Sequence, residues 1–173
     1  MILKQIWIIS NNGLQLFSYN IEKNGGVTNA QERMSNFLKA SGIFNIVTYF
    51  NQFLLEEPVS SFLTNNLLWV LHYETIMNYE TNKEINYAVI ALAQIDLTVP
   101  IEPQKQVITQ FCKTVSMEFY RECGDQIEAF TNLQLEIFEG FKPRCVSLIK
   151  TFEEEIADAL EMRLVARTNS NRK

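Results

Sequence analysis

The most constraining stretch of the sequence is residues 3–20, LKQIWIISNNGLQLFSYN. Two runs rich in Ile, Trp, Leu, Phe and Tyr flank Asn12 and Gly13, a pair that adopts positive φ at low cost and favours a tight hairpin turn. We predict two antiparallel strands over residues 3–10 and 14–20. Because both faces of the first strand are apolar, we expect other parts of the chain to cover the hairpin on both sides.

The composition is that of a folded domain. A chain of 173 residues fits one domain, or one domain with an appended helical region. Hydrophobic residues make up 47% and charged residues 20%, which argues against intrinsic disorder. The net charge of −5 provides no basic field for phosphate backbones, so nucleic acid is not expected as a partner.

The apolar runs and the first residues bear on localisation. Each apolar run is interrupted well before the ~18 residues that a membrane-spanning helix needs. Residues 1–4 lack the basic start and apolar run of a secretory signal. We therefore expect a cytoplasmic protein that reaches a membrane surface, if at all, only through its partners.

Cysteine and histidine usage gives no sign of a metal site or cofactor. The three cysteines, Cys112, Cys123 and Cys145, are an odd number without a CxxC motif, so we expect reduced thiols acting as small core residues. His72 is the only histidine and lies in a predicted strand. A zinc site would have to recruit scattered cysteines and acids around it, and none is predicted.

The first helix is expected to begin at Ser41, which can cap its free amide groups, and to end before Pro58. A shorter helical stretch is expected before it, over residues 31–39. Thr48 lies off the apolar face and is expected to be solvated. The helical spacing of the apolar residues predicts one continuous face that covers one side of the sheet, formed by Ile43, Ile46, Val47, Phe50, Phe53 and Leu54.

Three more strands and a helical last third complete the prediction. The strands are expected at residues 59–63, 67–75 and 87–95, with a turn at 65–66 and a polar connection at 79–86. One helix is expected to end near Gly124, a second to span residues 133–141, and a third to run from Cys145 for about five turns. The predicted fold class is α+β, a five-stranded antiparallel sheet with the first helix inserted after strand 2 and with C-terminal helices (β-β-α-β-β-β-α-α).

This order of elements resembles a known family. QIWIISNNGLQLFSYN resembles the first hairpin of longin-like domains, and SGIFNIVTYFNQFLLEEPVSSF resembles the first helix and third strand of longin and roadblock-type proteins, notably prokaryotic small-GTPase-associated ones. The resemblance covers residues 2–119 in element order. The 20–40 connection and the extension after Cys123 are longer than usual, and no heptad-rich segment or tail anchor follows, so a vesicle-fusion SNARE is not expected.

The resemblance implies a SNARE-like fold with a longin-like domain over residues 1–125 and a helical extension over 126–173 packed on the same domain. It also implies a non-catalytic module that pairs through a sheet edge or its first helix. Such domains form homodimers or pair with other longin or roadblock subunits. They serve as subunits of membrane-trafficking complexes and as platforms or regulators for small Ras-like GTPases.

The resemblance also points to candidate interface residues, for which core packing is an equal or better explanation. These are Ile2, Trp7, Ile43, Ile46, Val47, Phe50 and Phe53.

No catalytic constellation is recognised. A Ser-His-acid set would have to use His72, but no GxSxG motif is present. The consecutive acids 153–155 fan out around a helix and predict a solvated face rather than a metal site. We therefore do not expect an enzyme.

A second hypothesis is a small-molecule sensor with a profilin-like α/β sheet that encloses an apolar ligand. Twelve Phe residues motivate it, and Trp7, Trp69, Phe17 and Tyr19 are its candidate lining residues. Aromatic residues on strands more often belong to a core, which is the alternative.

Overall fold

The computed structural model describes residues 1–23, 30–53, 59–78, 82–129 and 135–170. The chain divides into two compact units, Met1–Phe141 and Lys142–Lys173, which are described separately below. The boundary expected between residues 125 and 126 lies inside a helix. That the C-terminal region packs on the same domain stays a prediction.

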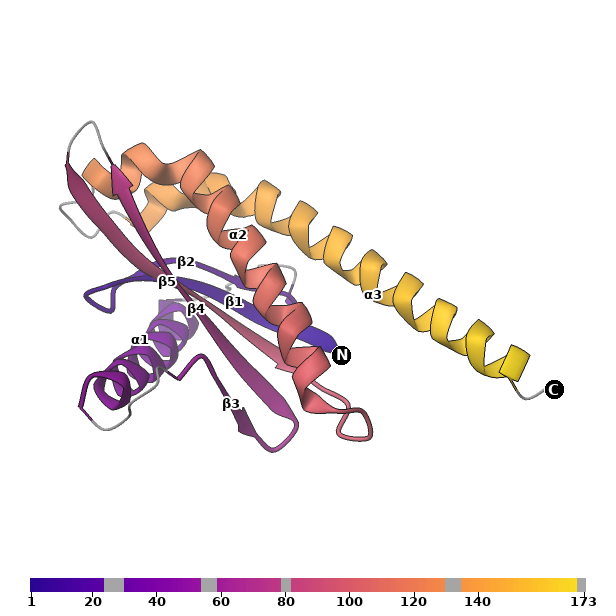
Figure 1. Ribbon diagram of the computed structural model, residues 1–173. Coiled ribbons are helices and arrows are strands. Elements are labelled where there is room, and N and C mark those ends of the chain that lie inside the picture. Colours follow the sequence, from indigo (N-terminus) through magenta and orange to yellow (C-terminus); the bar gives the residue numbers. More distant parts are fainter. Residues whose placement is uncertain (24–29, 54–58, 79–81, 130–134, 171–173) are drawn as a thin grey trace. The chain divides into compact units, whose positions relative to one another are not determined.

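The first unit has an α+β fold built on an antiparallel sheet (Figure 1). Within the described residues the sheet has five strands in the order β2-β1-β5-β4-β3. The edge strands are β2 and β3, and the hairpin predicted from residues 3–20 lies at one side of the sheet. The strands are β1 (Ile2–Ser10), β2 (Gln15–Asn20), β3 (Ser61–Thr64), β4 (Leu67–Asn78) and β5 (Lys83–Gln94).

The turn between β1 and β2 differs in type from the simplest hairpin turn. Gly13 has φ of 80°, whereas Asn12 is not in the positive-φ region. The amide of Gly13 donates to the Ser10 carbonyl at 2.9 Å, and the Ser10 amide donates to the Leu14 carbonyl at 2.9 Å. This pattern is a turn followed by a glycine in the left-handed conformation, so only the glycine of the predicted pair supplies positive φ.

The hairpin of β4 and β5 is longer than predicted. The expected polar connection 79–86 is wrong in part, because β5 begins at Lys83 and its first residues pair with the end of β4. Ile76 pairs with Ile85, and Ile85 is buried. One buried isoleucine among polar neighbours gives too weak an alternation for the pattern to predict a strand there.

Helix α1 (Ala30–Phe53) is one continuous helix. The predicted start at Ser41 is therefore wrong, and Ser41 lies in the helix interior. Its hydroxyl, nearly buried, donates to the carbonyl of Gly13 at 2.6 Å and so joins α1 to the β1–β2 turn. The predicted end near Pro58 lies outside the described residues.

The inward face of α1 is rotated from the predicted one. Phe44 and Val47 are buried against the sheet, whereas Ile46, assigned to the core face, is 58% exposed. Thr48, expected in solvent, has a buried hydroxyl oxygen. The four apolar residues Ile43, Phe44, Ile46 and Val47 are nearly consecutive, so helical period alone does not decide which of them face inward.

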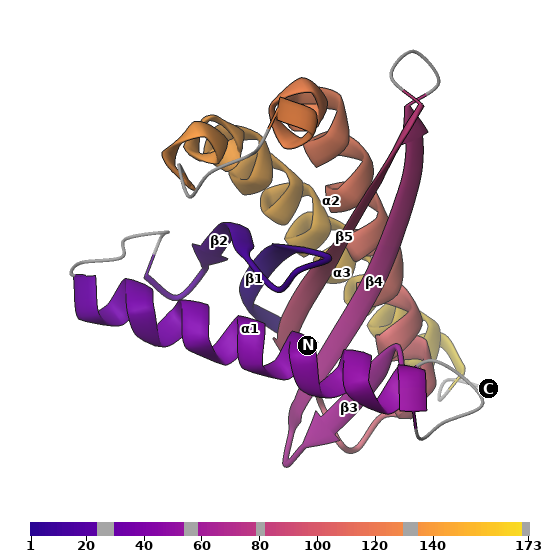
Figure 2. The same ribbon diagram turned by 90° about the vertical axis from the view of Figure 1, so that its left-hand side faces the viewer.

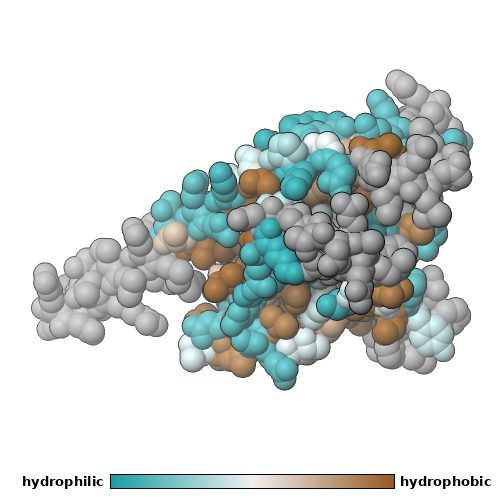
Figure 3. Space-filling model, turned by 180° about the vertical axis from the view of Figure 1, so that it is seen from behind, coloured by the Kyte–Doolittle hydropathy of each residue, from teal (hydrophilic) through white to brown (hydrophobic). Residues whose placement is uncertain are grey.

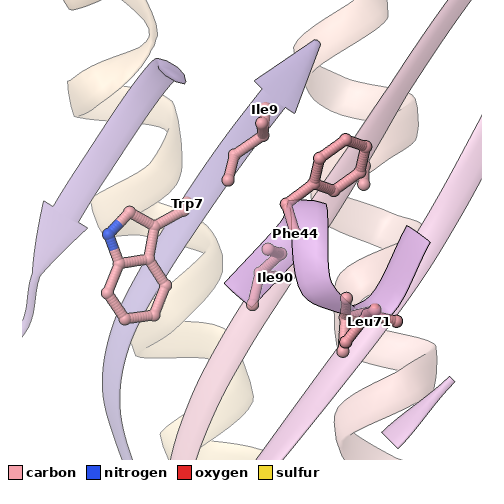
Figure 4. Close-up of a cluster of buried hydrophobic side chains, with 7 residues drawn as sticks. Trp7, Ile9, Phe44, Leu71 and Ile90 are labelled. Carbon is pink, nitrogen blue, oxygen red and sulfur yellow. The ribbon is translucent and has the colours of Figure 1, made fainter. Parts of the chain in front are cut away.

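One face of the sheet is covered by α1, which crosses the strands in Figure 2. Side chains from three strands meet the helix there, and Figure 4 shows Trp7, Ile9, Ile90 and Leu71 around Phe44. The prediction that β1 is covered on both sides is confirmed, because five consecutive residues from Gln5 to Ile9 are buried.

The opposite face is covered by α2 (Ile101–Ala129) and the 3₁₀ helix η1 (Leu135–Phe141). Phe119 is fully buried, and its ring lies 5.8 Å from Tyr87, 5.6 Å from Phe138 and 5.1 Å from Phe141 between centroids. The predicted end of α2 at Gly124 is wrong, since the helix continues to Ala129. A single glycine weakens a helix by only ~1 kcal/mol, and the packing of the other α2 residues overcomes this cost.

The second unit contains α3 (Lys142–Ser170). The helix begins three residues before the predicted start at Cys145, with Pro143 in its first turn, where proline is tolerated. Glu153, Glu154 and Glu155 are exposed, as predicted for a solvated face. In the part of the chain that the structure describes, no helix is long and apolar enough to span a membrane.

Candidate functional site

The outer side of α1 carries exposed apolar side chains on a helix whose other side closes the core. Leu38, Ile46 and Tyr49 are 60%, 58% and 56% exposed. Together with Gly42 they follow one another at intervals of four, four and three residues, the spacing that places side chains on one side of a helix. We name the set Leu38, Gly42, Ile46 and Tyr49 the α1 outer stripe.

Gly42 lies at the centre of this stripe. A Cβ atom added to it would meet nothing within 4 Å, so the fold itself does not require a glycine there. Glycine inside a helix costs ~1 kcal/mol relative to alanine. The residue leaves a low point between two protruding apolar side chains, which allows another backbone to approach closely.

The predicted interface residues fall into three groups. Ile2 and Ile46 are exposed, at 56% and 58%. Trp7 and Val47 are buried, and Ile43 is half-buried against the core cluster, so these three serve core packing, the alternative explanation given for them. Phe50 and Phe53 belong to α1, but their side chains lie outside those the structure describes.

Exposed apolar residues elsewhere are dispersed. Figure 3 shows separate brown areas between teal ones on one side of the molecule. Single exposed apolar residues are normal on protein surfaces. The α1 outer stripe is different because three of them share one helix face. The others lie on several elements and are Ile2, Leu63, Tyr73, Met77, Leu97, Ile101, Val107, Met117 and Ile137.

A second cluster joins polar side chains between the sheet and α2. His72 Nε2 lies 3.1 Å from Glu74 Oε2 on the same face of β4. The hydroxyl of Ser116, on α2, donates to the same carboxylate oxygen at 3.1 Å. Tyr87, on β5, donates to the Ser116 carbonyl at 3.0 Å. The structure thus brings a serine, a carboxylate and the histidine together, which the sequence did not indicate.

The order of these contacts does not fit hydrolase chemistry. In a catalytic triad the histidine lies between serine and carboxylate, so that it can take the serine proton. Here the carboxylate of Glu74 lies between Ser116 and His72, and Ser116 is fully buried. The cluster therefore satisfies buried polar groups at the α2–sheet contact. Among the described residues, no group of three or more His, Cys, Asp or Glu could hold a metal ion.

The cysteines Cys112 and Cys123 are free and buried, as expected for core thiols. Burial raises the pKa of Cys112 to about 12 and that of Cys123 to about 11. The reactive thiolate forms are therefore negligible at neutral pH.

A scan of the chain against protein-family models found no match, and a search of curated proteins found none either. The resemblance to longin-like domains therefore rests on the quoted residues and the element order, and it stays a prediction.

The polar cluster gives an alkaline pH dependence. Burial raises the pKa of the Tyr87 hydroxyl to about 12 from 10.0, so between these values the unfolded chain releases a proton that the folded chain retains. Stability must then fall as pH rises. We expect wild type to exceed Tyr87→Phe in unfolding free energy by about 1 kcal/mol at pH 8. This difference should fall from pH 10 to 12 by up to ~1.4 kcal/mol per pH unit, so that Tyr87→Phe becomes the more stable protein near pH 12. Urea unfolding of both proteins at each pH measures the difference in unfolding free energy. A difference that does not change with pH would contradict the raised pKa of Tyr87.

Sequence reasoning missed Leu38, Gly42 and Tyr49. The signal was present, since Gly42 is an interior helical glycine flanked at four residues on each side by Leu38 and Ile46. It could not be used because the helix was predicted to start at Ser41.

Proposed function

We infer that this chain is a non-catalytic protein-interaction module that pairs with a second copy through the α1 outer stripe. The observation that carries this proposal is the symmetry of the stripe. Leu38 and Ile46 lie four residues on either side of Gly42 and are exposed almost equally, at 60% and 58%. A surface patch that pairs with itself must be self-complementary about a two-fold axis.

An antiparallel pair of α1 helices with the axis at Gly42 satisfies this requirement. Residues at equal distances before and after Gly42 then face each other across the axis. Leu38 of one copy packs against Ile46 of the other, and the two glycines lie face to face, where the missing side chains permit close approach. Ser35 faces Tyr49, and both are exposed.

Charge at the α1 outer stripe does not oppose a second copy. The chain carries a net charge of −5, so two copies repel each other at long range, and acids within the contact would add to this repulsion. The described side chains that would face each other include no acid; they are Ser35, Leu38, Lys39, Asn45, Ile46 and Tyr49.

The wider role follows from the family resemblance. Longin-like domains pair through the first helix or a sheet edge and serve in membrane trafficking or as platforms for small Ras-like GTPases. The observed element order of two strands, a helix, three strands and then helices supports this reading. We propose a Ras-like GTPase, or another longin or roadblock subunit, as the further partner of the paired module in the cytoplasm.

The apolar-ligand sensor is less well supported. Three of its four candidate lining residues contact one another or other core rings. Trp7 and Trp69 are stacked with centroids 5.6 Å apart, Trp69 stacks on Phe62 at the same distance, and Phe17 meets Phe141 at 5.3 Å. Rings that fill one another's contact surface form a core in preference to a cavity wall.

The proposed pairing is tested by disulfide trapping in the full chain. A disulfide requires Cβ atoms about 3.5–4.5 Å apart, which only a residue near the two-fold axis achieves with its own copy. Under mild oxidation we expect Gly42→Cys to form a covalent dimer. Leu38→Cys alone should not, but a mixture of Leu38→Cys and Ile46→Cys should cross-link.

The wild-type chain is the background control, because its three free cysteines, Cys112, Cys123 and Cys145, are buried. Equal cross-linking of Gly42→Cys and of Met117→Cys, an exposed position on α2, would overturn the proposed pairing. Capture of a Ras-like GTPase by the dimer, but not by a monomeric variant, tests the wider role.

A further inference from the structure

The turn between β1 and β2 places an exposed asparagine next to a glycine. An asparagine followed by glycine is the pair most prone to deamidation, because glycine has no side chain that hinders attack by its own backbone nitrogen. The fold requires the glycine here, since Gly13 has φ of 80° and a Cβ atom added to it would lie 3.0 Å from Asn45 Oδ1 of α1. Asn12 is exposed, so water and base reach it. The hairpin therefore carries a reactive pair that its own geometry requires.

Deamidation of this pair joins two atoms of the turn. The backbone nitrogen of Gly13 loses its proton to base and attacks Cγ of Asn12. The new N–Cγ bond closes a succinimide ring while the Cγ–Nδ2 bond breaks, and Nδ2 leaves as ammonia after taking a proton from water. Water then opens the ring at one of its two carbonyl carbons, which gives aspartate or isoaspartate. The reaction needs only water and base.

The closed turn holds both reacting groups in hydrogen bonds. The Gly13 amide donates to the Ser10 carbonyl at 2.9 Å, so the proton that must leave is engaged. The side-chain oxygen of Asn12 accepts from the Ser10 hydroxyl and from the Leu14 amide, the latter at 3.4 Å. These bonds fix the asparagine side chain within its own turn. Ring closure therefore requires the turn to open first.

A contact with α1 opposes this opening. The Gly13 carbonyl accepts a hydrogen bond from the Ser41 hydroxyl at 2.6 Å, and both residues are buried. Exposed turns ordinarily open at a low cost in free energy, because few buried contacts hold them. Here the opening also breaks a hydrogen bond to a residue 28 positions away in the sequence. The rate of deamidation in the folded chain is thus set by how often the turn separates from α1.

We propose that Asn12 is a deamidation site that the folded chain keeps unreactive through this closed turn and its bond to Ser41. Modification then occurs in molecules whose turn has opened. The isoaspartate product has one more carbon atom in the backbone before Gly13, so the turn cannot form again with the same hydrogen bonds. Deamidation of Asn12 is therefore an irreversible mark of opening at the β1–β2 turn.

Peptide mapping by mass spectrometry, after incubation of the full chain in mildly alkaline buffer, tests the proposal. We expect Asn12 to deamidate about tenfold or more slowly in the folded chain than in the urea-unfolded chain, since at least two hydrogen bonds must open. Asn24-Gly25 is a second Asn-Gly pair in the sequence. In urea the two pairs should react at similar rates, which shows that the sequence around Asn12 does not itself slow the reaction.

A matched pair of serine variants assigns the protection to the contact with α1. Ser41→Ala removes the bond to Gly13 but none within the hairpin, and it should speed up deamidation of the folded chain about fivefold. Ser147→Ala, at an exposed position on α3, should leave the rate unchanged. If Ser41→Ala does not fold, the two wild-type rates decide alone. Equal rates in folded and unfolded wild type, or equal rates in the two folded variants, would overturn the proposal.

Discussion

Replacement of Phe119 by alanine is expected to lower the free energy of unfolding by ~3–5 kcal/mol. Phe119 is fully buried on α2, and its ring contacts the rings of Tyr87, Phe138 and Phe141. The truncation removes all three contacts and leaves a space that α2, η1 and β5 can close only by moving toward one another. Urea unfolding followed by circular dichroism measures the change.

Met117→Ala is the matched control for this variant. Met117 is two residues away on the same helix but 69% exposed, so its truncation should change stability by less than about 0.5 kcal/mol. A loss of less than about 1 kcal/mol in Phe119→Ala would contradict the packing of α2 and η1 on this face of the sheet.

Ile46→Asp is expected to raise the dissociation constant of the dimer about a hundredfold or more. Each dimer would bury two carboxylates, each against a leucine of the other copy, with no partner for the charge. Since Ile46 is 58% exposed in the single chain, the variant should fold with nearly unchanged stability. Sedimentation equilibrium of both proteins measures the two dissociation constants.

Met117→Asp controls for the effect of added charge on an exposed apolar position. Because Met117 lies on α2, this variant should keep the wild-type dissociation constant. Equal weakening by both substitutions would indicate general charge repulsion and count against the α1 outer stripe as the contact.

The sheet could be predicted from the sequence because its strands carry strong local signals. Asn12-Gly13 and Asn65-Asn66 mark turns, and Gly13 and Asn65 do adopt positive φ, at 80° and 57°. Apolar residues on both faces of β1 also indicated cover on both sides. The start of β5 was missed because residues 83–86 are held by cross-strand pairing with β4, which sequence spacing does not reveal.

The first helix was harder to predict because its apolar residues do not define one face. Ser41 and Gly42 look like a helix start, yet α1 runs through both. The hydroxyl of Ser41 is bonded to the Gly13 carbonyl, a partner 28 residues away in the sequence. This tertiary contact and the packing of Phe44 and Val47 on the sheet fix which side of the helix faces inward, and the candidate interface follows from that orientation.

Of the candidate site, Ile46 was predicted, whereas the role of Gly42 was not. The buried side-chain atoms of Gln5, Trp7 and Gln15 that lack a hydrogen-bond partner could not be predicted either, because strand register decides which polar side chains meet. Patterns of hydrophobicity indicate which residues are buried on folding. They do not indicate which buried polar atoms lack a partner.

The pairing of two copies is tested most directly by light scattering on the unmodified chain over a range of concentrations. A contact built on one helix face lies at the small end of protein interfaces, below about 1,200 Å², so we expect a dimer that dissociates on dilution. We expect a mass that approaches twice 20.1 kDa at high concentration and falls toward 20.1 kDa on dilution. A mass of 20.1 kDa at every concentration would contradict it.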